Sequence, residues 1–279
     1  MLIGTVTALS ALVGTALCVS SCAVHGLGYL WVLPVGFAAA FLALALVVFL
    51  VLWVSCALVD LQKPQEKESK YYRFLVRLLM PAAMSILQVR MTTKGLEKAP
   101  KQGRFLLVCN HLHLVDPLVL LRYFPKNQLT FISKQENSSM FLVGKLMHKI
   151  MCQLVNREND REALKTILKC VELIKEDRHC VGVFPEGYIH GDNLMHPFRH
   201  GVFKIAQKTG VPIVVCTMRG TQDAFRNAMR LKPTDVELRV VDVIQPEQYA
   251  GMRATQIGNM AYEMMAADLG PERVWQPDN

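Results

Sequence analysis

The first part of the chain is hydrophobic without interruption. The first charged side chain is Asp60. A helix needs about 20 apolar residues to cross a bilayer, and residues 2–24 and 29–58 both meet this length. The uncharged segment His25–Gly28 separates them. The pattern predicts that residues 1–60 form a membrane anchor of two transmembrane helices arranged as a hairpin.

A cleaved signal peptide is the simplest alternative for this segment. Secretory signals begin with a positively charged region, and no Lys or Arg precedes the apolar stretch here. Val19–Cys22 resembles a lipoprotein cleavage site, but the same basic region is missing. The hairpin is therefore the better interpretation.

Basic residues follow the hairpin directly, at Lys63, Lys67, Lys70, Arg73 and Arg77. The positive-inside rule assigns them to the cytoplasmic face, which predicts a protein of the cytoplasmic membrane with its polar domain on the cytoplasmic side. Within residues 61–90 the cations recur at helical spacing, so we expect a basic amphipathic helix on an anionic membrane surface. An ordinary linker helix with a solvated face is the alternative.

Residues 91–279 alternate short β-branched runs with helical segments. Such alternation predicts an α/β domain with a largely parallel, buried sheet. The expected strands are Arg104–Cys109, Gln128–Ile132, Cys180–Phe184, Pro212–Thr217 and Val236–Ile244. The expected helices are Pro117–Phe124, Ser139–Met151, Asp160–Lys175, Gly201–Thr209 and Ala254–Leu269. The last strand alternates polar and apolar residues, which indicates an edge strand.

Composition narrows the class of ligand. The net charge is +8, and the eight cysteines include no CxxC pair. Neither a zinc site nor a thioredoxin-type redox site is indicated, and free thiols are the simplest interpretation. The positive charge suits an anionic membrane or a phosphorylated substrate as well as nucleic acid. Because the chain has a membrane anchor and no nucleic-acid motif, we favour lipid.

The segment Asn110–Pro117, NHLHLVDP, is the first candidate for chemistry. Asp116 before Pro117 is typical of a helix N-cap, and capping alone would explain it. His111 precedes Asp116 by five positions across a strand-to-helix loop. In that arrangement the carboxylate can orient one ring nitrogen and leave the other free as a general base. His113 as the base and Cys109 as a nucleophile are competing candidates.

Three further blocks follow this one in order: VNRE at Val155–Glu158, FPEG at Phe184–Gly187 and GVPIV at Gly210–Val214. Over roughly residues 88–250 the sequence resembles the PlsC-like 1-acyl-sn-glycerol-3-phosphate acyltransferases, a family of lysophospholipid acyltransferases. Each block is short, but four in order behind a membrane anchor are specific. The resemblance implies an α/β fold of the glycerolipid acyltransferase type.

The resemblance also implies a reaction. A free glycerol hydroxyl attacks an acyl thioester, either acyl-CoA or acyl carrier protein, with no cofactor, no metal and no acyl-enzyme intermediate. The expected product is phosphatidic acid. The implied roles are general base for His111, its orienting partner for Asp116, acceptor phosphate contacts for Arg157 and Lys134, and an acceptor-binding turn for Glu186 and Gly187.

Two departures from the family concern the acceptor. Many members follow FPEG with Thr-Arg-Ser, whereas this chain has Tyr188-Ile189-His190. The expected arginine is absent, so Arg199, Arg157 or Lys134 must replace it, or the head group differs. The usual serine two places after the catalytic histidine is His113.

Two alternative functions stay open on the sequence. An acyltransferase for another acceptor, such as glycerol-3-phosphate, another lysolipid or an ornithine-type lipid, would fit the altered residues after FPEG. A membrane-tethered esterase or thioesterase belongs to a different class. It would use Cys109 or a serine with His111, and the absence of a GxSxG elbow counts against it.

Overall fold

A computed structural model describes residues 2–156 and 159–276. It begins with two antiparallel helices, α1 (Leu2–His25) and α2 (Val32–Ala57), joined by the short 3₁₀ helix η1 (Leu27–Tyr29). They pack closely because Gly14 leaves no room for a side chain: a Cβ there would lie 2.8 Å from the backbone nitrogen of Phe37. The two expected helices are confirmed. Both are long and apolar enough to cross a membrane, a criterion of length and composition only.

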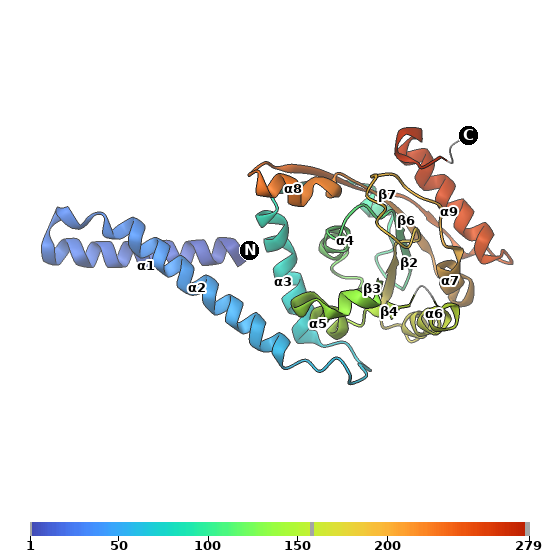
Figure 1. The fold of residues 1–279 in the computed structure, drawn as a ribbon, viewed down its shortest axis with the longest axis horizontal. Helices are drawn as coiled ribbons and strands as arrows, with labels where there is room; N and C mark the ends of the chain where they lie inside the picture. Colours follow the sequence, from blue (N-terminus) through green and yellow to red (C-terminus); the bar gives the residue numbers. More distant parts are fainter. Residues whose placement is uncertain (1, 157–158, 277–279) are drawn as a thin grey trace.

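Helix α3 (Lys70–Ile86) lies between the hairpin and the α/β domain (Figure 1). The expectation that Arg73 belongs to a lipid-facing cationic stripe is wrong. Arg73 is 7% exposed, forms an ion pair with Glu68 and donates to the backbone oxygen of Leu129 at 2.9 Å. A buried guanidinium needs such partners, so this cation belongs to the interior, whereas Lys70 and Arg77 are exposed.

The domain is built on one sheet of seven strands in the order β1-β7-β6-β2-β5-β3-β4. All neighbouring strands are parallel except β6 and β7, which are antiparallel. The strands are β1 (Val89–Lys94), β2 (Leu106–Cys109), β3 (Leu129–Lys134), β4 (Gln153–Val155), β5 (Cys180–Val183), β6 (Ile213–Arg219) and β7 (Thr234–Ile244). The predicted α/β fold with a largely parallel sheet is confirmed.

The placement of β7 at an edge is wrong, because β7 pairs with β1 on one side and β6 on the other. The sequence interpretation missed β1, whose polar sequence VRMTTK carries no β-branched apolar run. It also missed β4, which is only three residues long. The sheet therefore starts at Val89, within the range assigned to the juxtamembrane segment.

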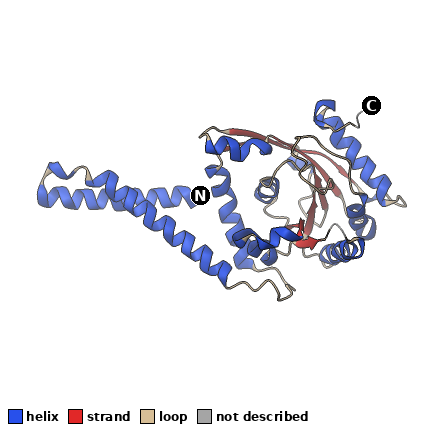
Figure 2. Cartoon of the chain, viewed as in Figure 1, coloured by secondary structure: helices blue, strands red, loops and turns tan. Residues whose placement is uncertain are grey.

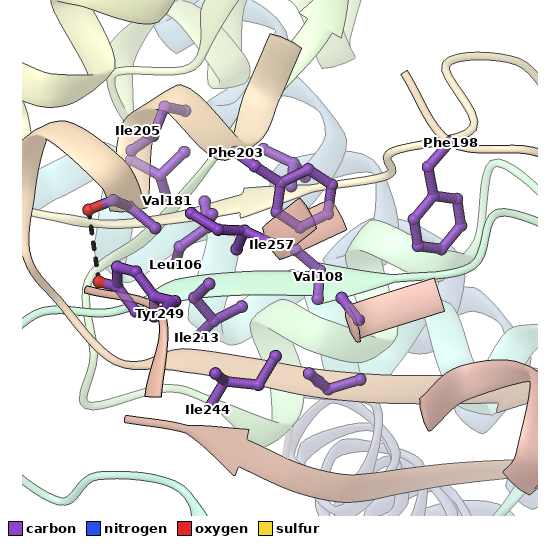
Figure 3. Packing of buried hydrophobic residues seen from close by; sticks show 14 of the residues in the cluster. Leu106, Val108, Val181, Phe198, Phe203, Ile205, Ile213, Ile244, Tyr249 and Ile257 are labelled. Atoms are coloured by element: carbon purple, nitrogen blue, oxygen red, sulfur yellow. Dashed lines mark hydrogen bonds between the residues drawn. The ribbon is translucent and has the colours of Figure 1, made fainter. Parts of the chain in front are cut away.

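Helices cover both faces of the sheet (Figure 2). Successive residues of β2 point to opposite faces, so Leu106 and Val108 join one buried cluster and Leu107 and Cys109 the other. Figure 3 shows the first cluster, to which Ile257 from α9 contributes. The helices are α4 (Asp116–Tyr123), α5 (Phe141–Lys149), α6 (Asp160–Lys175), α7 (Lys204–Thr209), α8 (Ala224–Met229) and α9 (Ala254–Leu269).

Candidate active site

The loop from β2 to α4 carries the NHLHLVDP block at the carboxyl end of a central strand. Its first residue, Asn110, is 1% exposed and ties the strand end to β6. The Asn110 side chain accepts from the backbone nitrogen of Met218 at 2.7 Å and donates to its backbone oxygen at 3.0 Å. This clamp holds the start of the loop against the sheet.

Asp116 does not serve as the N-cap of α4, contrary to the capping expectation. It is the first helical residue, Val115 occupies the cap position, and no side-chain cap bond is present there. The carboxylate instead turns back into the loop. Its Oδ2 accepts from the backbone nitrogens of Leu112 at 2.7 Å and His113 at 2.8 Å. Asp116 thus shapes the loop that carries the histidine.

The same carboxylate oxygen lies 2.8 Å from Nδ1 of His111. Because Oδ2 already accepts from two backbone N–H groups, it meets the ring as an acceptor, which assigns the proton to Nδ1. Nε2 of His111 makes no hydrogen bond within residues 2–156 and 159–276, and the ring lines a cavity. The Phe184 ring stacks on it at a centroid distance of 4.0 Å, which fixes its plane. The pair therefore offers an oriented base with its lone pair toward the cavity.

Thr221 completes this arrangement and was missed by the sequence interpretation. Its hydroxyl donates to Oδ1 of Asp116, the oxygen that the loop leaves unused. Thr221 lies just after β6 and is fully buried. The contact joins residues 105 positions apart, and no local pattern marks it. With it, both carboxylate oxygens have donors.

Glu186 of the FPEG block bridges two loops. Oε1 accepts from the backbone nitrogen of His111 at 2.7 Å, and Oε2 from that of His196 at 2.9 Å. Glu186 is only 3% exposed and does not line the cavity. Burial raises its pKa to about 8, although the two N–H donors oppose that shift. The geometry makes Glu186 a positioning residue for the His111 backbone.

This raised pKa predicts a pH-dependent stability. Since the pKa of Glu186 is about 8 in the folded chain, against an ordinary value of 4.5, the folded state binds the proton more tightly than the unfolded state. The contribution of Glu186 to the free energy of unfolding is full below pH 4.5 and is lost as the pH rises through about 8. We expect urea unfolding in detergent to show a decline over this range that is absent in Glu186→Gln. Parallel pH profiles in the two proteins would contradict the assignment.

Gly187 leaves space at the turn for the side chain of Arg199. Its φ is +83°, and a Cβ would lie 3.0 Å from Cδ of Arg199. Arg199 is held there by its backbone nitrogen, which donates to the oxygen of Pro185 at 2.8 Å, and by the Tyr188 ring, whose centroid lies 4.8 Å from its guanidinium carbon. No carboxylate within the described ranges pairs with this guanidinium.

The cavity beside His111 has a volume of about 610 Å³. Gly187, Arg199 and Lys134 also line it, and Lys134 lies 2.8 Å from Glu136. Much of the remaining lining is apolar and comes from α4, α5 and the strand before α6, including Leu118, Leu121, Val143, Met147, Ile150 and Val155. An apolar chain and an anionic group can therefore both be accommodated next to the histidine. Arg157, the expected phosphate contact of the second block, lies outside the described residues.

The competing candidates are placed away from the cavity. Cys109 is fully buried, and burial raises the pKa of its thiol well above the ordinary value. A buried neutral thiol is a poor nucleophile. His113 does not line the cavity, burial lowers its pKa, and its ring lies 5.0 Å from that of Phe225. Within the described residues, no group of three or more His, Cys, Asp or Glu side chains could hold a metal.

Comparisons with known proteins agree with this geometry. A family model described as Acyltransferase matches residues 90–219, the segment that contains His111, Asp116 and the FPEG turn. A probable 1-acyl-sn-glycerol-3-phosphate acyltransferase of Mycoplasma pneumoniae is 30% identical over 178 residues, which is 62% of this chain and 64% of that protein. A 1-acyl-sn-glycerol-3-phosphate acyltransferase of Cocos nucifera is 29% identical over 60% of this chain and 53% of its own length.

The chain thus spans between about half and two thirds of the lengths of these relatives. Among solved structures, the 1-acyl-sn-glycerophosphate acyltransferase PlsC from Thermotoga maritima superposes with a TM-score of 0.60 at 20% identity, over 75% of this chain and 83% of that one. That likeness confirms the fold. The family model and the relatives show that the segment carrying the site is similar to 1-acyl-sn-glycerol-3-phosphate acyltransferases, and the solved structure shares the fold.

Proposed function

We propose that this protein transfers a fatty acyl group from an acyl thioester to the free hydroxyl of 1-acylglycerol-3-phosphate, giving phosphatidic acid. The observation that carries the proposal is the His111–Asp116 pair, whose Nδ1 and Oδ2 atoms lie 2.8 Å apart. The pair lies at the wall of a largely apolar cavity that is also lined by the basic side chains of Arg199 and Lys134. The relatives named as acting on this acceptor support the choice of substrate.

The proposed reaction has one chemical role for each member of the pair. Nε2 of His111 removes the proton of the acceptor hydroxyl as its oxygen attacks the thioester carbonyl. The carbon–sulfur bond breaks, and the imidazolium returns the proton to the departing thiolate. Asp116 keeps the proton on Nδ1 and stabilises the positive ring. No side chain is acylated, which agrees with the burial of Cys109.

Arg199 and Lys134 are the proposed contacts for the acceptor phosphate. Ile189 stands where many family members carry an arginine, and Arg199 supplies a guanidinium to the cavity. Its guanidinium carbon lies 4.8 Å from the centroid of the Tyr188 ring, and a guanidinium can make a bidentate contact to a phosphate. Lys134 would add a point charge. The departure from the family sequence is thus accompanied by a cation in this structure.

Arg199→Ala is expected to raise the KM for the phosphorylated acceptor by about 10- to 100-fold, because a hydrogen bond to a charged group contributes roughly 1.5–3 kcal/mol. The KM for the thioester should change little. Lys204→Ala is the matched control, since Lys204 is exposed and does not line the cavity. Steady-state kinetics with each substrate varied in turn would test this. Equal increases in both KM values would contradict the assignment of Arg199 as a contact for the acceptor phosphate.

We further propose that the hairpin anchors the enzyme in the cytoplasmic membrane with the α/β domain on the cytoplasmic side. The basic residues after the hairpin, with Lys63, Lys67, Lys70 and Arg77 exposed, support this orientation. An anchored domain suits a reaction whose acceptor and product are both lipids. Acyl-CoA or acyl carrier protein would reach the cavity from the aqueous phase.

The proposed function is tested by supplying purified full-length protein in vesicles with a labelled acyl thioester and a panel of acceptors. The panel contains 1-acylglycerol-3-phosphate, glycerol-3-phosphate, a zwitterionic lysolipid and no acceptor. We expect labelled phosphatidic acid with the first acceptor only. Product with another acceptor would keep acyl transfer and change the substrate. Free fatty acid released without any acceptor would instead identify a hydrolase.

A further inference from the structure

The turn between α8 and β7 exposes two large apolar side chains. Met229 is 82% and Leu231 81% exposed, the highest values among the large apolar residues that the structure describes. Phe225, one turn earlier on α8, is 47% exposed. A contiguous cluster of exposed apolar side chains marks a protein or membrane interaction site.

The backbone of this turn makes the exposure of Leu231 more informative. Its φ is +53°, in the left-handed region that favours glycine. The nitrogen of Leu231 donates to the oxygen of Ala228 and that of Lys232 to the oxygen of Asn227, the pattern of a Schellman motif. Glycine would suit this position best, yet the chain places there a leucine that packs against almost nothing. Local stability does not explain that choice.

Cations flank the apolar side chains. Arg230 and Lys232 are exposed, and neither pairs with a carboxylate within the described ranges, whereas Arg226 pairs with Asp223. Apolar side chains next to unpaired cations are the composition of a surface that enters the interface of an anionic bilayer. We call Phe225, Met229, Arg230, Leu231 and Lys232 the α8 patch.

The α8 patch lies on the side of the domain from which the hairpin projects (Figure 1). The nitrogen of Thr234, just after the patch, donates to the oxygen of Gln88 at 3.1 Å, so the turn sits beside the end of α3. Ile86 at that end is 68% exposed. Phe225 also lines the cavity that contains His111. The patch therefore lies between the exposed end of α3 and the substrate cavity.

We propose that the α8 patch is a second membrane contact, which inserts into the headgroup region of an anionic bilayer and holds the cavity at the lipid surface. The choice of lipid over a protein partner rests on the charge of the patch and on its position beside the end of α3, on the side of the domain from which the hairpin projects (Figure 1). The expected benefit of this membrane contact is the direct entry of a lipid acceptor into the cavity, and that benefit rests on the proposed function. Insertion itself does not depend on that function.

Insertion can be measured without activity. A polarity-sensitive fluorophore on Met229→Cys, in full-length protein reconstituted in vesicles, should show a blue-shifted emission when the vesicles contain anionic lipid. The same label on Leu168→Cys is the matched control, because Leu168 is 40% exposed on α6 and does not line the cavity. Signal from the native cysteines is subtracted with labelled wild type. Emission at residue 229 that matches the control would overturn the proposal.

Leu231→Gly separates docking from folding. Glycine relieves the left-handed backbone, so the urea midpoint should rise or stay unchanged, while the KM for a long-chain acceptor in anionic vesicles should rise about 5- to 10-fold. Activity on a short-chain acceptor dissolved as monomers should be unchanged. An unchanged vesicle KM, or a dimer in detergent that Leu231→Gly converts to monomer, would overturn membrane docking, the latter in favour of a second copy of the chain.

If the fluorophore shifts but no acceptor is acylated, the docking proposal stands and the proposed function fails. If acylation occurs without the shift, the reverse holds.

Discussion

His111→Ala is expected to reduce turnover by about 10²- to 10⁴-fold, the usual contribution of a general base. Nε2 of His111 has no hydrogen-bond partner among the described residues, its ring lines the cavity, and alanine leaves no group there to accept the hydroxyl proton. Its backbone nitrogen, which donates to Glu186, is retained. We therefore expect near-native unfolding by urea together with a lost acyl-transfer rate, measured at saturating acceptor and thioester.

His113→Ala is the control for this result. His113 lies two residues away, keeps its backbone donation to Asp116 after substitution, and does not line the cavity. Its turnover should remain within a few-fold of wild type. If His113→Ala lost activity and His111→Ala kept it, the roles of the two histidines would have to be exchanged.

Asp116→Asn is expected to keep the fold and to lower turnover about 10- to 100-fold, less than His111→Ala. Three N–H donors, from Leu112, His113 and the His111 ring, converge on Oδ2, so the asparagine oxygen must occupy that position. Its amide group then faces the hydroxyl of Thr221, which can accept. The proton stays on Nδ1 of His111, and only the charge that stabilises the imidazolium is lost, roughly 1.5–3 kcal/mol.

Asp116→Ala provides the contrast. It leaves the same buried donors without an acceptor, which costs about 1–3 kcal/mol for each unsatisfied group, so the loop should lose order and the urea midpoint should fall clearly. Urea unfolding and turnover of the two variants distinguish the roles. If the asparagine variant lost as much stability as the alanine variant, Asp116 would matter for the loop alone.

Several elements followed from local patterns in the sequence. Helices α6 and α9 match the expected ranges Asp160–Lys175 and Ala254–Leu269, because their apolar positions recur with the helical period. The five β-branched runs all form strands, and the uncharged N-terminus forms two long helices. Side chains at these positions respond mainly to neighbours a few residues away, so a single sequence carries the information.

The order and pairing of the strands could not be predicted from these local patterns. β7 alternates polar and apolar residues as an edge strand does, but β1, 145 positions earlier by register, covers its open side. The short β4 and the polar β1 form strands only because a neighbour supplies their backbone partners. Propensity describes the strand, whereas order in the sheet depends on contacts between distant segments.

The residues of the candidate site also fall into those expected from the sequence and those found only in the structure. From the sequence, His111 and Asp116 could be paired because they lie five positions apart in one strand-to-helix loop, and the resemblance to the family marked the FPEG turn and Lys134. Three contacts appear only in the folded chain: Glu186 holds the His111 backbone, Thr221 donates to Asp116, and Arg199 passes close to Gly187 at the cavity wall. The first two contacts join separate strand ends, and their geometry exists only once the sheet has brought those ends to one edge. The third lies within the long connection after β5.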